Sequence, residues 1–241
     1  MRINQLAIVR RNIERASREA TERLGQFGSA TVHEAMGRVG LMQPYMRPIY
    51  SGEPVSGTAV TVLLHPGDNW MIHVGIEQCQ PGDIMVVGVT ADNTDGMFGE
   101  LLGTSMKARG VKGLVIDAGC RDVRPLEGIG FPVWSRAISA KGTVKSVLGN
   151  VNLPVVCAGV TVNAGDVIVA DDDGVVVVPF ALATSVAERA AARVAKELKS
   201  GERLGSGELS LDINDMRPTL EKLGLRYVET LEQAYSIPDR A

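Results

Sequence analysis

The chain has few of the features that would place it in a specialised class. Its 241 residues include only three cysteines, Cys79, Cys120 and Cys157, which lie far apart and form no CxxC pair. We therefore expect neither a zinc site nor a disulfide framework, but thiols packed in the core of a cytoplasmic protein. No apolar run approaches the ~20 residues of a membrane span. The N-terminus, rich in arginine and acids, lacks the apolar region of a signal peptide.

The sequence also has little net charge and no nucleotide-binding motif. Its formal net charge is -3, and its pI is about 5.7, so nothing indicates the clustered basic surface that nucleic acid requires. The motifs GxGxxG and GxxxxGK[ST] are absent, which gives no support to a dinucleotide site or a P-loop. With 45% hydrophobic and 22% charged residues, the composition is that of an ordinary globular protein without nucleic-acid or membrane partners.

The N-terminal forty residues predict two helices. The first is expected over roughly residues 1–30. Its expected buried positions are Leu6, Val9, Ile13 and Leu24. Ser29 and Thr31 can cap a second, short helix over residues 30–38, which glycines terminate.

Strands and helices alternate through the rest of the chain. We expect a helix capped by Asp68, with Trp70 and Ile76 turning inward, and further helices over residues 98–110 and 181–199. The expected strands are 58–65, 84–88, 114–117, 132–135, 152–156, 166–171 and 174–179. This pattern predicts one layered α/β domain over residues 1–241, with a mixed sheet or barrel-like core. The tail from about Gly205 is expected to pack as an extension on this domain or against a partner.

Two segments carry the candidate chemistry. Residues 99–110 begin a helix, so the backbone amides of Leu101 and Leu102 should lack helical acceptors and can bind a carboxylate. Residues 117–123 follow a short strand, the position where ligands bind in open α/β sheets. Glu100 opens the first segment. Whether the two segments meet depends on the fold.

The second segment contains the pair Arg121-Asp122. The guanidinium of Arg121 suits a bidentate contact with a carboxylate. Asp122 and Glu100 offer hard oxygen ligands for Mg²⁺ or Mn²⁺. Local structural roles stay open on spacing alone: Asp122 could cap the following turn, Arg121 could form a surface ion pair, and Glu100 could interact with its helix dipole.

Two other readings of the sequence are less favoured. The three adjacent acids in the stretch Asp171 to Gly174 could indicate a calcium site. Adjacent acids cannot all face one ion, however, so we expect a tight turn between two strands. A Schiff-base mechanism needs a desolvated lysine. The candidate lysines all lie in polar or glycine-flanked settings: Lys107, Lys112, Lys141 and Lys145.

The order Glu100-Leu101-Leu102, followed after twenty residues by Arg121-Asp122, resembles a known signature. It is similar to the D-x20-R-D motif of the class II pyruvate aldolases that act on 4-hydroxy-4-methyl-2-oxoglutarate and 4-carboxy-4-hydroxy-2-oxoadipate. The likeness covers nearly the whole chain. Stretches that carry it include ATVHEAMGR, DNWMIHVGIEQC, ARGVKGLVIDAG, FPVWS, GTVK and VNLPVVCAGVTVNAGDVIVADDDGVVVV.

By this resemblance, Asp122 ligates a divalent metal, Mg²⁺ or Mn²⁺, and Arg121 holds pyruvate and stabilises its enolate. The amides of Leu101 and Leu102 bind the pyruvate carboxylate. Glu100 stands where the family usually has Asp and orients metal-bound water through a side chain that is one methylene longer.

The resemblance also implies a second group of site residues and an assembly. Asn69, His73, Ser17 and Glu34 match the pocket for the distal carboxylate, and Glu197 matches an outer-shell acid from a neighbouring subunit. The implied fold is similar to that of swivelling phosphohistidine domains, and the implied assembly is a homotrimer or homohexamer.

The implied activity is metal-dependent cleavage of 4-carboxy-4-hydroxy-2-oxoadipate to pyruvate and oxaloacetate, in the degradation of protocatechuate or gallate. Oxaloacetate decarboxylation is an expected side activity, since it passes through the same enolate. The alternative is a non-catalytic protein-binding regulator, because the regulator of ribonuclease E activity resembles these aldolases in fold.

Overall fold

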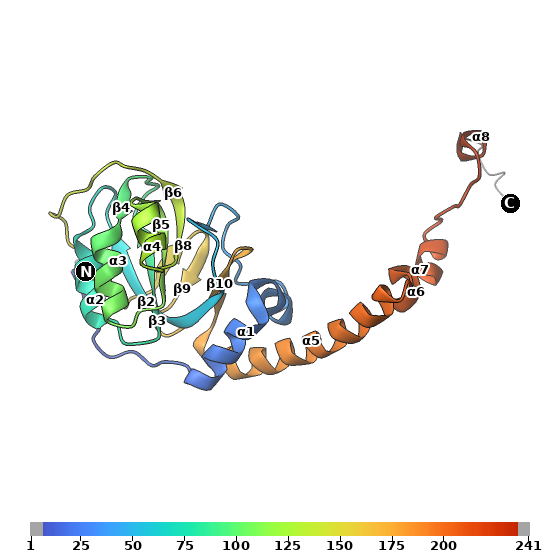
Figure 1. The fold of residues 1–241 in the computed structure, drawn as a ribbon, viewed down its shortest axis with the longest axis horizontal. Coiled ribbons are helices and arrows are strands. Elements are labelled where there is room, and N and C mark those ends of the chain that lie inside the picture. The colour runs from blue at the N-terminus through green and yellow to red at the C-terminus, as the bar shows by residue number, and fades with distance from the viewer. Residues whose placement is uncertain (1–6, 236–241) are drawn as a thin grey trace, which may run out of the picture. The chain divides into compact units, whose positions relative to one another are not determined.

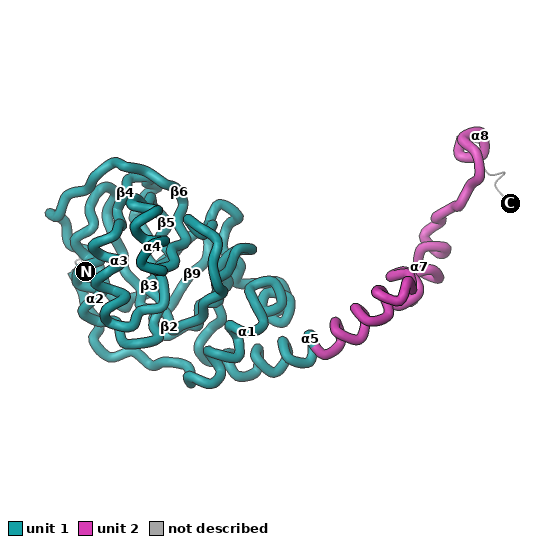
Figure 2. The backbone as a smooth tube through the Cα atoms, in the orientation of Figure 1, with its two compact units in different colours: residues 1–194 teal, residues 195–241 magenta. Residues whose placement is uncertain are grey.

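The computed structural model describes residues 7–235, and the chain divides into two compact units (Figure 2). Unit 1, residues 1–194, contains both sheets. Unit 2, residues 195–241, contains the end of a long helix and three short helices. The idea that the C-terminal extension packs on the main domain or on a neighbouring subunit stays a prediction. Over residues 7–235, no helix is long and apolar enough to cross a membrane.

Among the described residues, nine strands form one mixed sheet (Figure 1), in the order β1-β6-β5-β3-β2-β10-β11, with β4 paired to β5 and β7 paired to β2. These strands are β1 (Arg47–Pro48), β2 (Val55–Leu64), β3 (Asp83–Val89), β4 (Gly96–Phe98), β5 (Gly113–Cys120), β6 (Val133–Ile138), β7 (Asn150–Val151), β10 (Val167–Asp171) and β11 (Gly174–Val178). Strands β2 to β6 pair in parallel, and the others pair antiparallel. The carboxyl ends of the parallel strands therefore meet at one edge.

The sheet curls until its two ends nearly meet. The Arg47 guanidinium, on β1, donates to the carbonyl of Asp173 at 2.7 Å. On β6, Nε1 of Trp134 donates to the carbonyl of Asp171 at 2.8 Å. These bonds join β1 and β6 to the β10–β11 hairpin at the opposite end of the strand order. The sheet is therefore barrel-like, which confirms the predicted α/β class and core.

Layers cover both faces of the central strands. The helices are α1 (Arg18–Ala35), α2 (Trp70–Gln78), α3 (Glu100–Ala108), α4 (Val123–Gly128), α5 (Ala183–Gly205), α6 (Ser210–Ile213), α7 (Arg217–Lys222) and α8 (Leu231–Tyr235), with a 3-10 turn η1 (Phe180–Leu182). Helices α2, α3 and α4 pack on one face, whereas the hairpin of β8 (Val155–Cys157) and β9 (Val160–Val162) packs on the other. Helix α1 and the start of α5 cover β10 and β11. Burial on both faces explains the nearly continuous apolar runs of β2, β3 and β5.

The N-terminal helix begins later than the sequence predicts. Residues 7–17 are not helical, and Val9 forms a bridge with Val151 instead. Helix α1 starts only after Ser17, whose hydroxyl accepts the N–H of Ala20 at 3.1 Å. Of the expected buried positions, Leu24 is fully buried, while Leu6 lies outside the described residues. A cap and a bridge partner therefore set this boundary rather than periodicity.

The predicted break near Ser29 appears as a kink in α1. Gly28 has φ 75° and ψ 165°, a conformation that glycine adopts without strain. The Asp171 carboxylate accepts the Ser29 N–H at 2.6 Å and its hydroxyl at 2.5 Å, so Asp171, rather than Ser29, caps the second half of the helix. Asp171 also pairs with Gly174 in the predicted tight turn, where it accepts the N–H groups of Asp173 and Gly174. The hairpin interpretation is confirmed.

Three further expectations need correction. Trp70 is 42% exposed rather than buried, whereas Ile76 does pack inward. Asp68 is not the N-cap residue of α2, since Asn69 occupies that position, although the Asp68 carboxylate does accept the N–H of Trp70. The last predicted apolar position of the long helix, Leu198, is 66% exposed. The three cysteines are free and buried, as expected.

The hydrogen bond from Trp134 predicts a measurable contribution to stability. We expect Trp134→Phe to lower the free energy of unfolding by about 1–3 kcal/mol, because the buried indole loses its hydrogen bond to the carbonyl of Asp171. Urea unfolding followed by circular dichroism measures this change. Trp70→Phe is the matched control, since Trp70 is largely exposed, and should shift the midpoint little. Equal shifts for the two variants would contradict this role for Trp134.

Candidate active site

A cavity of about 560 Å³ lies at the edge where the parallel strands end. Its walls come from segments that follow three of these strands: α2 after β2, Arg121 and Asp122 after β5, and the chain after β6. The start of α3 supplies the fourth side. Seven residues expected at the site line this cavity: Asn69, His73, Glu100, Leu101, Leu102, Arg121 and Asp122.

One wall joins the two segments singled out in the sequence. The Asp122 carboxylate, through Oδ2, accepts the backbone N–H of Glu100 at 3.1 Å. The first amide of α3 to close a helical turn is that of Gly103, which bonds the carbonyl of Gly99 at 3.0 Å. The N–H groups of Leu101 and Leu102 precede it and have no acceptor in the helix. Free amides at the positive end of a helix dipole suit an anion.

Asp122 and Arg121 are held by their backbone. Asp122 has φ 60° and ψ 41°, the left-handed region, and its carbonyl accepts the N–H of Leu126 in α4. The N–H of Arg121 donates to the carbonyl of Phe98 at 2.9 Å. Nε of Arg121 then lies 3.6 Å from Oδ2 of Asp122, with both side chains partly exposed. A fixed cation and a carboxylate thus border the same cavity.

Close backbone approach explains why Gly99 precedes α3. A Cβ atom at this position would lie 2.3 Å from Oδ2 of Asp122 and 3.1 Å from Cγ of Arg121. Its φ of −163° is ordinary extended backbone, so space rather than conformation requires glycine here. Any larger residue would displace the Arg121-Asp122 pair.

The opposite wall contains Asn69 and His73 of α2 together with Lys145. Asn69 donates through Nδ2 to the carbonyl of Met97 at 3.0 Å, while its buried Oδ1 has no partner among residues 7–235. Burial and the nearby Lys145 ammonium lower the pKa of His73 from its ordinary value of 6.5. The imidazole is therefore neutral at pH 7, and Lys145 supplies the positive charge of this wall.

Lys145 is the main cavity residue that sequence reasoning missed. It was weighed only as a Schiff-base lysine, and its side chain is exposed, so it lacks the burial that this chemistry needs. The stretch GTVK, which ends at Lys145, resembles the aldolases and was the available signal. Five further lining residues, not singled out before, are Gly96, Met97, Phe98, Ser105 and Ile76.

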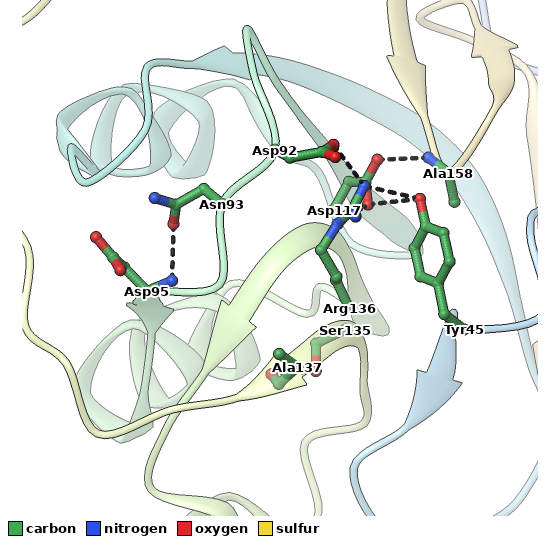
Figure 3. Close-up of polar contacts among 9 residues, drawn as sticks. All are labelled: Tyr45, Asp92, Asn93, Asp95, Asp117, Ser135, Arg136, Ala137 and Ala158. Carbon is green, nitrogen blue, oxygen red and sulfur yellow. Dashed lines mark hydrogen bonds and ion pairs between the residues drawn. The ribbon is translucent and has the colours of Figure 1, made fainter.

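A polar network joins β5 and β6 to the turn between β8 and β9 (Figure 3). The Asp117 carboxylate on β5 accepts Nε of Arg136 at 2.9 Å, the hydroxyl of Tyr45 at 3.0 Å and the N–H of Ala158 at 2.8 Å. Arg136 also reaches Asp92 at 3.1 Å and lies over the Tyr45 ring at 4.4 Å from its centroid. Burial and the Asp117 charge raise the pKa of Tyr45 to about 12, so its hydroxyl remains a donor. The network joins β5, β6 and the loop that leads into β4.

Three predicted site residues do not line this cavity. Ser17 caps α1, and Glu34, near the end of α1, forms ion pairs with Arg38 at 3.0 Å and with Arg193 at 3.6 Å. Within one chain, neither residue borders the cavity, because α1 packs on β10 and β11 instead. Glu197 belongs to unit 2. The roles that the resemblance implies for these three residues stay predictions.

The donor set fits a hard divalent cation. Asp122 and Glu100 both line the cavity, and the Asp122 carboxylate is 39% exposed, so oxygen remains available for a ligand. The described part of the chain holds no cluster of three or more His, Cys, Asp or Glu suited to a metal cage. Mg²⁺ and Mn²⁺ need no such cage, since Mg²⁺ is commonly bound by one or two carboxylates and keeps several waters.

A family model described as RraA-like, Aldolase/RraA, matches residues 29–177. The chain belongs to the Aldolase/RraA family. This match includes every residue that lines the cavity.

Relatives of this family bear two kinds of name. A Halalkalibacterium halodurans protein named "Putative 4-hydroxy-4-methyl-2-oxoglutarate aldolase" is 30% identical over 74% of this chain and 82% of its own length. A Burkholderia multivorans protein of the same name is 29% identical over 59% of this chain and 87% of its own. The crystal structure of Streptomyces coelicolor RraAS2 is described as that of an unusual member of the RNase ES inhibitor RraA protein family. It matches this chain with a TM-score of 0.68 at 27% identity. It covers 80% of this chain and 99% of that chain.

The charge next to His73 makes its pKa a test of the cavity wall. We expect Lys145→Met to raise the pKa of His73 toward 6.5, since the repulsion from the ammonium is removed. An NMR titration of the His73 ring proton measures this value. Lys141→Met is the matched control, because Lys141 pairs with Asp95 at 3.0 Å and should leave the pKa of His73 unchanged. If the pKa of His73 is the same in wild type and in Lys145→Met, the placement of the Lys145 ammonium beside His73 is wrong.

Proposed function

We propose that this member of the Aldolase/RraA family is a divalent-metal-dependent aldolase that cleaves a 4-hydroxy-2-oxo acid with at least two carboxylates and releases pyruvate. The observation that carries the proposal is the cavity itself. Arg121, Asp122 and the free amides of Leu101 and Leu102 border one side, and Lys145 borders the other. Two separate cationic or dipolar anion sites in one cavity suit a small diacid. The aldolase names of two relatives support the same chemistry.

The pyruvyl end of the substrate binds at the start of α3. The N–H groups of Leu101 and Leu102 donate to its carboxylate, and the Arg121 guanidinium donates to the oxygen that becomes the enolate oxygen. Such a donor stabilises charge that develops in the transition state, which is the most effective use of an electrostatic contact. Asp122, with Glu100 acting through water, would hold Mg²⁺ or Mn²⁺, and the bound ion would withdraw electron density from the 2-oxo group.

Cleavage then requires one proton to leave and one to arrive. A water held by Glu100 takes the proton of the C4 hydroxyl, and C4 becomes a carbonyl carbon as the C3–C4 bond breaks. The electron pair of that bond moves onto the pyruvyl fragment as its enolate. Protonation at C3 gives pyruvate and completes the balance. Loss of carbon dioxide from oxaloacetate passes through the same enolate, which supports a decarboxylase side activity.

The far end of the substrate faces α2 and Lys145. The Lys145 ammonium pairs with the distal carboxylate, neutral His73 donates or accepts a hydrogen bond, and Asn69 completes the contact. We propose 4-carboxy-4-hydroxy-2-oxoadipate as the substrate, with 4-hydroxy-4-methyl-2-oxoglutarate as a second one, in the catabolism of aromatic compounds. In a homotrimer or homohexamer, Ser17, Glu34 and Glu197 of a neighbouring subunit are available to border this end.

A protein-binding regulator is the second candidate function. The likeness to RraAS2, a member of an RNase ES inhibitor family, favours it, since the alignment spans nearly all of that protein. The acid at position 100 together with Arg121-Asp122 favours the enzyme, because a docking surface has no need of free amides beside a carboxylate pair.

Metal dependence is the first test of the proposed function. We expect release of pyruvate from 4-carboxy-4-hydroxy-2-oxoadipate with Mg²⁺ or Mn²⁺, loss of release in EDTA, and recovery when metal is added back. A lactate dehydrogenase-coupled assay measures the product. Correctly folded protein that releases no pyruvate with either metal would favour the protein-binding regulator.

The space at Gly99 gives a sharper test of the Arg121-Asp122 pair. We expect Gly99→Ala to lower kcat by about 10²-fold, because the new Cβ must move Asp122 from a position that the reaction requires. Gly128→Ala is the matched control, since a Cβ there meets nothing within 4 Å. Steady-state rates with circular dichroism spectra measure both. A Gly99→Ala enzyme of wild-type kcat would exclude this role of the Asp122 position.

A further inference from the structure

The chain between β6 and β7, residues 139–149, forms one wall of the cavity without being a helix or a strand. We call this segment the strap. It carries Lys145 into the lining of the cavity. Its first half is tied to β4, since the carbonyl of Lys141 accepts the N–H of Gly96 at 2.8 Å and its ammonium pairs with Asp95. Val144 makes a bridge to Asp68.

The second half of the strap depends on one carboxylate. Oδ2 of Asp68 accepts the N–H of Ser146 at 2.6 Å, the hydroxyl of Ser146 at 3.1 Å and the N–H of Val147 at 2.9 Å. These are the hydrogen bonds that tie residues 145–148 to the rest of the described chain. Ser146 and Val147 are themselves exposed, so packing contributes little to holding them.

Asp68 also contacts α2. Its Oδ1 accepts the N–H of Trp70 at 2.9 Å, in the first turn of α2. Asn69 and His73, at the start of this helix, line the cavity together with Lys145 of the strap. A single side chain, only 2% exposed, therefore joins the start of α2 to the segment that presents Lys145.

The chemistry of this contact requires an ionised carboxylate. Four donors converge on Asp68, and an ionised carboxylate has only acceptors. Burial alone raises the pKa of Asp68, but the N–H groups of Trp70, Ser146 and Val147 and the Ser146 hydroxyl outweigh it, so the pKa lies below its ordinary value. An asparagine at position 68 would have to turn its NH₂ group toward either the N–H of Trp70 or the donors of the strap. In both orientations donors would face donors, and hydrogen bonds would be lost.

We propose that Asp68 is a positioning residue that fixes the strap against α2, and thereby sets the separation of Lys145 from Asn69 and His73 for binding the distal carboxylate of the substrate. This inference rests on the proposed function. Asp68 itself faces backbone donors rather than the substrate, so it acts through the strap. Its loss should weaken binding of the distal end more than chemistry at the pyruvyl end.

The test compares Asp68→Asn with Asp166→Asn. Asp166 is a matched control because it is also buried, at 4% exposed, and accepts backbone N–H groups of Asn163 and Phe180, away from the cavity. We expect Asp68→Asn to raise KM for the diacid by about tenfold and to change the exchange of pyruvate methyl protons with D₂O by less than about threefold. Asp166→Asn should leave KM unchanged. An unchanged KM in Asp68→Asn overturns the proposal.

A double-mutant cycle separates positioning from a general loss of structure. If Asp68 acts through Lys145, then Asp68→Asn should raise KM much less in a Lys145→Met background than in the wild type. Full additivity of the two changes overturns the proposal. Should Asp68→Asn fail to fold, Ser146→Ala removes one of the four bonds, and we expect a KM increase of about two- to threefold. An unchanged KM in Ser146→Ala would likewise overturn the proposal.

Hydrogen exchange distinguishes failure of this inference from failure of the proposed function. We expect faster exchange in peptides covering residues 144–149 of Asp68→Asn, but not of Asp166→Asn, whatever the protein catalyses. Wild-type protein that neither releases pyruvate nor exchanges its methyl protons would overturn the proposed function. If hydrogen exchange in residues 144–149 is the same in Asp68→Asn and wild type, the anchoring of the strap by Asp68 is overturned, whereas the proposed function is not.

Discussion

The contact between the Asp122 carboxylate and the N–H of Glu100 determines how this site is built. It joins the turn after β5 to the first turn of α3, through two residues that lie 22 positions apart in the sequence. Because Asp122 accepts that one amide, it leaves the next two amides of the helix free and keeps its own charge at the cavity. The left-handed backbone of Asp122, the bare Cα of Gly99 and the bond from Arg121 to Phe98 all serve to keep this contact.

The remainder of the site follows from the direction of the strands. Since β2, β5 and β6 run parallel, the segments that leave them emerge at the same edge, and each contributes one wall. The Asp117 network and the Asp68 carboxylate then fix loops that have no regular structure of their own. Buried or half-buried carboxylates that accept backbone N–H groups recur in this fold, at Asp68, Asp117, Asp166 and Asp171.

Local sequence patterns predicted the central strands and the α3 segment well, because each is a continuous apolar run or a clear helix start. They failed where a distant partner decides the outcome. The extended stretch up to Ser17 is held by partners such as Asp83 and Val151, which no local pattern reveals.

The site residues divide in the same way. Glu100 and Asp122 were recognisable from residue type and spacing, and the fold brought them together. Lys145 was overlooked because its strap has no periodicity, and its position depends on a carboxylate 77 residues earlier in the chain. Ser17 and Glu34 came only from resemblance, and a single chain gives them other partners.

The Asp171 turn has a consequence for how this fold tolerates change. Tight hairpin turns at a surface usually accept inserted residues, because little besides the two strands depends on them. Here the same carboxylate that shapes the turn also caps the second half of α1, and the carbonyls of Asp171 and Asp173 receive the donors that close the sheet. Lengthening this turn would loosen a helix and a barrel seam together, so this surface hairpin is a poor place for an insertion or a fusion.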